Sequence, residues 1–142
     1  MENKNIYTAL SAFQQECPVI HKGTEGYGYS YADLSTILGI INPLLAKNGL
    51  GFTQPLDGKS VKTILFHIES GDTIESTIEI PQDVSLAKMN QFQVLGSAIT
   101  YLRRYALASI LGLVTDKDTD ASELPTINQP EAKAITGGVI RR

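Results

Sequence analysis

The sequence predicts an α+β domain in which a three-stranded antiparallel β-meander packs against a long C-terminal helix, with two helices before the meander. Three observations predict this fold. Apolar residues recur at helical spacing in residues 4–17 and again in residues 32–47. Three β-rich runs separated by glycine-containing turns follow in residues 50–80. One sustained helical pattern then fills residues 88–114, and this helix is the expected cover for the apolar face of the meander.

Each of the two N-terminal helices carries one apolar stripe. The first, residues 4–17, ends at a proline. The second, residues 32–47, stops at Asn48-Gly49, and Pro43 is expected to kink it or to divide it into two shorter helices. The residues expected to face inward are Ile6, Leu10, Phe13 and Cys17 in the first helix and Leu34, Ile37, Leu38, Ile41 and Leu45 in the second.

The meander is expected to consist of residues 50–56, 61–69 and 73–80, with a tight turn at Asp57-Gly58. A three-residue turn centred on Gly71 gives each of the last two strands one apolar and one polar face. With this register, the covered face holds Ile64, Phe66, Ile68, Ile74, Ser76 and Ile78, and the open face holds Thr63, His67, Glu69, Glu75, Thr77 and Glu79.

The long helix is expected to bury one stripe and to carry a candidate site on its other faces. A helical wheel centred on Ile99 places Arg103 about 40° away, at the edge of the stripe, and Arg104 about 140° away, toward solvent. Residues 96–100 are mostly small, so a phosphate backbone or a neighbouring subunit can approach closely. The stripe consists of Phe92, Leu95, Ile99, Leu102, Ala106, Ile110 and Leu113.

Arginine and tyrosine on this helix suit single-stranded nucleic acid. A guanidinium group binds phosphate in a planar, bidentate manner. Tyrosines at positions i and i+4 can stack on bases, or they can close a protein interface. The candidate DNA-binding residues are Arg103, Arg104, Tyr101, Tyr105, Lys62, Lys88, Tyr27 and Tyr29.

The same residues also have purely structural interpretations. An arginine pair on a helix is usually solvated or salt-bridged, and Arg103 is placed to pair with a carboxylate such as Asp33, Asp116 or Asp118. The tyrosines of residues 27–31 pack in cores or interfaces more often than against bases. The net charge of −3 also means that DNA contact requires local clustering of cations, because the chain as a whole is not basic.

Composition argues against several other classes of protein. The only cysteine, Cys17, cannot form an intrachain disulfide, and no stretch approaches the ~20 apolar residues of a membrane span, so a cytoplasmic location is expected. No catalytic residue, metal or cofactor is expected. The alternating aspartates of residues 116–120 lack the companions of a nuclease site. His21, His67 and Cys17 are too few for a zinc site or a triad.

Two blocks of sequence resemble the Erf (essential recombination function) family of phage single-strand annealing proteins. They are YSYADLSTILGIINPLLAKNGL and, after the strands, GSAITYLRRYALASILGL followed by DKDTD. The resemblance covers roughly Tyr27 to Asp120. It implies a β-β-β-α core, ATP-independent annealing of complementary strands, and assembly into a ring or filament. It also implies that Arg103 and Arg104 face DNA, and that a phage exonuclease or a host single-strand binding protein is the kind of protein partner involved.

Two other functions fit the same residues. One is an oligomeric binder that protects single strands without annealing them, and the other is a structural oligomer in which the arginines make intersubunit salt bridges.

The domain is assigned to residues 1–117. Residues 118–142 are expected to form a mobile tail, acidic and then polar.

Overall fold

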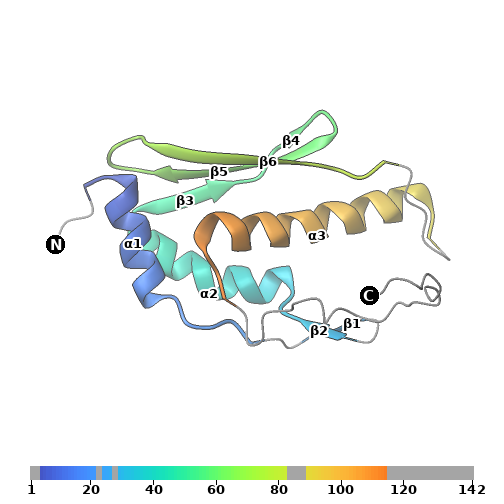
Figure 1. The fold of residues 1–142 in the computed structure, drawn as a ribbon, viewed down its shortest axis with the longest axis horizontal. Helices are drawn as coiled ribbons and strands as arrows, with labels where there is room; N and C mark the ends of the chain where they lie inside the picture. The colour runs from blue at the N-terminus through green and yellow to red at the C-terminus, as the bar shows by residue number, and fades with distance from the viewer. Residues whose placement is uncertain (1–3, 22–23, 27–28, 83–88, 115–142) are drawn as a thin grey trace, which may run out of the picture.

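In the part of the chain that the structure describes, the protein is an α+β domain with three helices on one side of an antiparallel sheet (Figure 1). The computed structural model describes residues 4–21, 24–26, 29–82 and 89–114. The predicted α+β class is confirmed. The boundaries proposed for the tail and its mobility lie outside the described residues.

The three helices begin after side chains that accept backbone N–H groups. They are α1 (Ile6–Glu16), α2 (Leu34–Lys47) and α3 (Gln91–Leu111), and their N-caps are Asn5, Asp33 and Asn90. Pro43 lies within α2 without dividing it. At the other end of α3, Gly112 adopts a left-handed conformation (φ 71°) that ends the helix.

The main sheet is built around β5 (Ser60–His67). One edge of β5 pairs with β6 (Thr73–Glu79), and the other edge pairs with β3 (Leu50–Thr53) and β4 (Leu56–Asp57). β3 and β4 keep a single register against β5, so these two strands act as one strand that is interrupted at Gln54-Pro55. A separate small hairpin joins β1 (Thr24–Gly26) to β2 (Tyr29–Tyr31).

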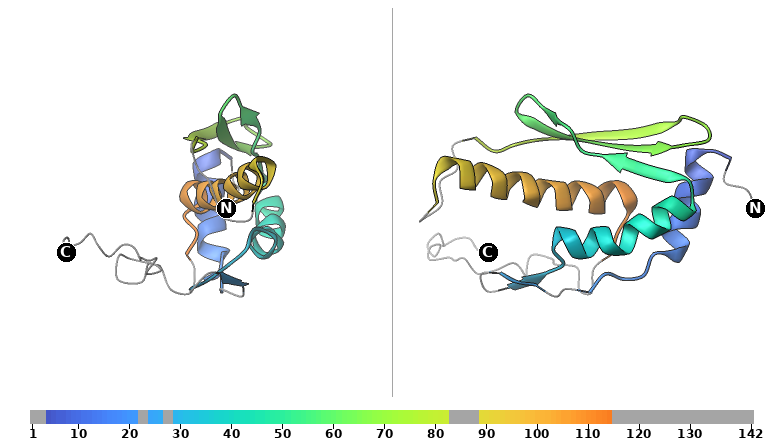
Figure 2. Two further views of the ribbon diagram at one scale, coloured as in Figure 1. Left: turned by 90° about the vertical axis from the view of Figure 1, so that its right-hand side faces the viewer. Right: turned by 180° about the vertical axis from the view of Figure 1, so that it is seen from behind.

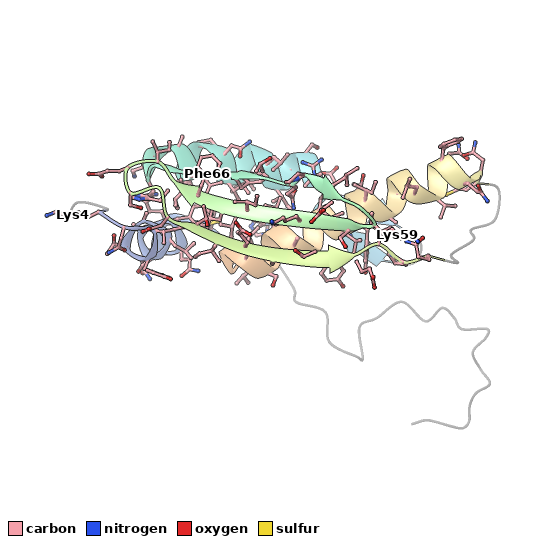
Figure 3. The ribbon with its side chains drawn as sticks, turned by 90° about the horizontal axis from the view of Figure 1, so that it is seen from above. Lys4, Lys59 and Phe66 are labelled. Atoms are coloured by element: carbon pink, nitrogen blue, oxygen red, sulfur yellow. The ribbon has the colours of Figure 1, made fainter. Side chains whose placement is uncertain are left out.

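The sheet forms the upper layer and the helices the layer beneath it (Figure 2). In this arrangement α3 packs against β5 and β6, while α2 packs against β3. Phe13, Ile41, Leu65 and Leu107 meet in the core and are completely buried. The opposite face of the sheet is covered by none of the described elements, and Figure 3 looks onto it.

The predicted register between the last two strands is wrong. Ile74 pairs with Leu65 in place of Ile68, a shift of three residues, and an odd shift exchanges the two faces of β5. The buried side chains of β5 are therefore Val61, Thr63, Leu65 and His67, whereas Ile68 is exposed.

A longer turn than the one expected causes this shift. The backbone N–H of His67 donates to the carbonyl of Asp72 at 2.9 Å, so the turn consists of Ile68–Gly71. The His67 ring holds the turn from inside, because its Nδ1 lies 2.7 Å from Ser70 Oγ and accepts the Ser70 N–H at 3.2 Å.

Phe66 was expected on the covered face but lies on the open one. It pairs with Gly51 across the strands, and a Cβ atom at Gly51 would lie 2.5 Å from the Phe66 ring. The ring therefore lies across the glycine, and a larger residue at position 51 would displace it. Figure 3 labels Phe66 on this face.

Only one part of α3 is buried in the core. Ala106, Leu107 and Leu111 are buried, and we call residues 106–111 the packed end. Residues 91–105, the protruding part, include no buried residue. Phe92 and Leu95 were expected inside, but they are 85% and 45% exposed. The start of α3 extends past the N-terminal end of α2, so α2 does not lie beneath the start of α3 (Figure 1).

Candidate nucleic-acid interface

An arginine and two tyrosines form a contiguous group on the solvent side of α3. The guanidinium carbon of Arg104 lies 5.2 Å from the centroid of the Tyr101 ring, within the range of a cation–π contact. The Tyr101 and Tyr105 rings meet edge to face, with centroids 4.8 Å apart and planes at 72°. Both rings remain about half exposed, at 44% and 54%. The helix thus presents a preorganised cation beside two accessible aromatic faces.

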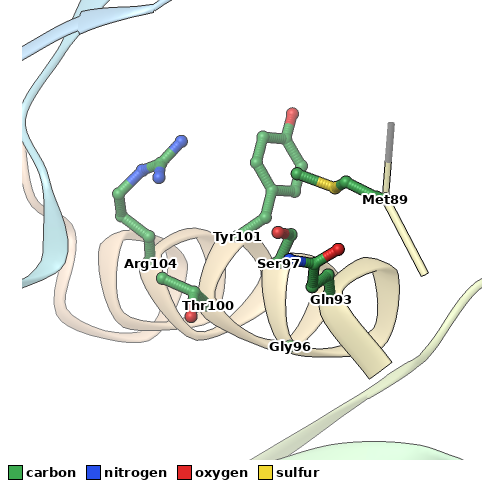
Figure 4. A pocket seen from close by; sticks show the side chains of 7 residues that line it. All are labelled: Met89, Gln93, Gly96, Ser97, Thr100, Tyr101 and Arg104. Carbon is green, nitrogen blue, oxygen red and sulfur yellow. The ribbon is translucent and has the colours of Figure 1, made fainter. Parts of the chain in front are cut away.

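A shallow hollow of about 710 Å³ runs beside this group. Its floor is Gly96, Ser97 and Thr100, which carry little or no side chain (Figure 4). A Cβ atom at Gly96 would meet nothing within 4 Å, so the surface there is open. The other residues that line the hollow are Met89, Gln93, Tyr101 and Arg104.

Arg103 faces the sheet, and its environment differs from that of its neighbour. Its Nε donates to Gln54 Oε1 at 3.0 Å, and the guanidinium is partly buried. One structural interpretation of the sequence paired Arg103 with a carboxylate. Among the described residues its side chain bonds instead to the neutral amide of Gln54, and Asp116 and Asp118 lie outside the described residues. The expected difference between an inward Arg103 and an outward Arg104 agrees with the geometry.

Of the other candidate residues, Lys62 is the one that the structure places apart from this group. Lys62 lies on the open face of the sheet, 3.3 Å from Glu75, so the sheet separates it from α3. Tyr29 lies in β2. Tyr27 and Lys88 lie outside the described residues.

Gln54 is the residue near the site that sequence reasoning missed. It stands at the interruption between two strands, next to a proline that cannot donate to the sheet. The sequence could have indicated this residue through its position. Next to a proline, the strand is interrupted, so the side chain of a polar residue there need not follow the alternation of inward and outward side chains.

The described residues contain no cluster of three or more His, Cys, Asp or Glu side chains that could hold a metal ion. Burial raises the pKa of the Cys17 thiol, which lowers the fraction of nucleophilic thiolate at neutral pH. Within the same ranges, no helix has the length and hydrophobicity needed to span a membrane.

Comparison with known proteins identifies the class of this domain. The family model described as the ERF superfamily matches residues 6–137, and this chain therefore belongs to that family. At the family level, this indicates a protein of phage recombination and single-strand annealing. Searches of the curated proteins and of the solved structures found no match.

Proposed function

We propose that this protein binds single-stranded DNA through the solvent side of α3 and anneals complementary strands without ATP, as a homo-oligomer in the bacterial cytoplasm. The observation that carries the proposal is the exposed group of Arg104, Tyr101 and Tyr105 in a member of the ERF superfamily. Family membership indicates the class of function, and the geometry of this group supports its assignment as the binding surface.

The chemistry of this group fits a single strand of any sequence. Stacking of Arg104 on Tyr101 orients the guanidinium, a group whose planar shape suits phosphate. An exposed tyrosine ring accepts the face of any base, and stacking contributes about 1–3 kcal/mol per base. Nothing in such an arrangement reads base edges, so the Watson–Crick edges stay available to a second strand. That availability is the main physical requirement of annealing.

Oligomerisation is part of the proposal, because one cation per subunit binds DNA weakly. A ring or filament repeats the site and turns many weak contacts into a strong one. Two features support self-association. Phe92 and Leu95 expose apolar surface on α3, and β6 pairs on only one side within the described sheet.

The first test is binding and annealing by the full chain. Fluorescence anisotropy with a labelled single-stranded oligonucleotide is expected to show binding that weakens steeply as salt rises. Mixing complementary strands with the protein should accelerate duplex formation without nucleotide, and light scattering should report a mass well above a dimer. Binding without accelerated annealing would reduce the function to strand protection, and the absence of binding at low salt would refute the proposal.

A further inference from the structure

The side chain of Gln54 makes three hydrogen bonds, two to Arg103 of α3 and one to Thr63 of β5. Its Oε1 accepts the Arg103 Nε–H at 3.0 Å, and its Nε2 donates to the Arg103 carbonyl oxygen at 3.2 Å. The same nitrogen donates to Thr63 Oγ1 at 2.9 Å, and Thr63 is completely buried. Because Nε of arginine only donates and a carbonyl only accepts, these contacts fix the orientation of the amide.

These bonds lie where α3 leaves the core. Ala106, at the start of the packed end, is buried, and no residue of the protruding part is. Arg103 lies within one helical turn of both Tyr101 and Arg104. The Gln54 amide therefore holds the helix at the point where its completely buried apolar residues end, next to the residues of the proposed interface.

The Gln54 hydrogen bonds also determine which of two adjacent arginines faces the sheet. A rotation of α3 by about 100° would turn Arg104 into the direction that Arg103 takes, toward the sheet, and would turn Arg103 away from the sheet. Buried apolar residues restrain the rotation of the packed end, whereas the apolar residues of the protruding part that face the sheet, such as Ile99 and Leu102, are only half-buried. Gln54 contacts both the side chain and the backbone of Arg103, so it specifies which arginine faces the sheet.

We propose that Gln54 is a positioning residue for DNA binding: by holding Arg103 toward the sheet, it keeps Arg104 and Tyr101 turned toward the strand. This inference rests on the proposed function. Gln54 touches no DNA, and it acts through the orientation and rigidity of α3.

The test compares two glutamine-to-methionine variants. Methionine has a similar length and removes the hydrogen bonds without changing charge. Gln14 is the matched control, because its Nε2 also donates to an α3 carbonyl at 3.2 Å, that of Leu111 in the packed end. We expect Gln54→Met to lower affinity for a labelled oligothymidine roughly three- to tenfold, with an unchanged salt slope. Gln14→Met should leave affinity at the parent level, with both variants measured where circular dichroism shows them folded.

Arg104→Ala, measured alone and combined with Gln54→Met, separates a failure of the proposed interface from a failure of the positioning role of Gln54. If Arg104→Ala does not lower affinity, the interface is wrong, and the proposed function and this inference both fall. If it does, the loss in the double variant should be smaller than the product of the two single losses, because both changes disturb one surface. Parent-level affinity in folded Gln54→Met, or an equal loss in Gln14→Met, would overturn the positioning role alone.

A second variant keeps the test open if Gln54→Met does not fold. Arg103→Lys keeps the positive charge but removes the Nε donor that Gln54 binds. We expect reduced affinity at an unchanged salt slope, and affinity equal to that of the parent would overturn the inference.

Discussion

The two parts of α3 belong to one continuous helix but meet different surroundings. The packed end is enclosed by the core, with Leu107 and Leu111 completely buried. The protruding part carries Phe92 and Leu95 at exposed positions, although both continue the same apolar stripe. Helical periodicity therefore identifies an apolar stripe, but it does not identify the element that covers the stripe. The comparison also shows that the proposed interface begins where the core ends.

The largest expected effect is a difference in the free energy of unfolding between variants of the packed end and variants of the protruding part. Leu107→Ala should lower the free energy of unfolding by about 2–5 kcal/mol, because it leaves a cavity in the core. Leu95→Ala, the same change in the protruding part, should cost less than about 1 kcal/mol. Urea denaturation of both variants measures the difference. Equal losses would mean that the protruding part is also covered in solution, which would break the comparison.

The tyrosines give the next largest effect, on binding. Tyr105→Ala should weaken single-strand binding by about 1–3 kcal/mol if its ring stacks on a base. Tyr7, which is 70% exposed on α1, provides the matched control, and Tyr7→Ala should leave affinity unchanged. Anisotropy titrations at one salt concentration suffice. Equal losses in both variants would indicate nonspecific effects of removing a surface ring.

Substitution of the two arginines is expected to change the stability of the fold by different amounts. Arg103→Ala should destabilise the fold by about 1–3 kcal/mol, because it leaves the Gln54 carbonyl without its donor. Arg104→Ala should destabilise the fold less than Arg103→Ala, because the Tyr101 ring that Arg104 contacts is itself 44% exposed. Thermal melts of the two variants measure this contrast. A larger loss for Arg104→Ala would mean that the helix is rotated relative to this structure.

The smallest effect concerns the junction of α1 and α2. Glu16 accepts hydrogen bonds from Lys47 Nζ at 2.7 Å and from Asn48 Nδ2 at 2.9 Å, and these bonds lower the pKa of its carboxyl group, chiefly through Lys47. A lowered pKa stabilises the fold above the ordinary value of 4.5, and this stability is lost as pH falls through the folded pKa. Melts of Glu16→Gln should therefore show a slightly lower melting temperature than the parent at pH 7. The difference should shrink as the pH falls below 4.5, and a constant difference would contradict this origin.

The sequence was sufficient for the helices and for the strands of the main sheet because local signals define them, whereas the β1–β2 hairpin was not predicted. Helical periodicity and the Asn48-Gly49 stop located α2, and glycine-containing turns located the strands. The register of β5 against β6 was missed, because the His67 ring bonds to Ser70 and lengthens the turn. Turn length depends here on a side chain whose burial the sequence does not display.

The candidate site was only partly predictable for a similar reason. The wheel placed Arg104 outward and Arg103 inward because those directions follow from helix geometry alone. The partner of Arg103 was missed, because Gln54 lies 49 residues away in the chain and is neutral, whereas charge pairing suggested a carboxylate. The exposure of Phe92 was missed because it depends on where α2 begins relative to α3.

The most direct measurement of the central claim is the salt dependence of single-strand binding by the parent, Arg104→Ala and Lys62→Ala. Arg104 lies in the proposed interface, whereas Lys62 lies on the open face of the sheet beside Glu75. We predict that Arg104→Ala lowers affinity and reduces the slope of log affinity against log salt by about 0.7 for each phosphate that the arginine neutralises in the parent. Lys62→Ala should change neither quantity. The opposite pattern, with Lys62→Ala weakening binding and Arg104→Ala leaving it intact, would place DNA on the open face and contradict the proposal.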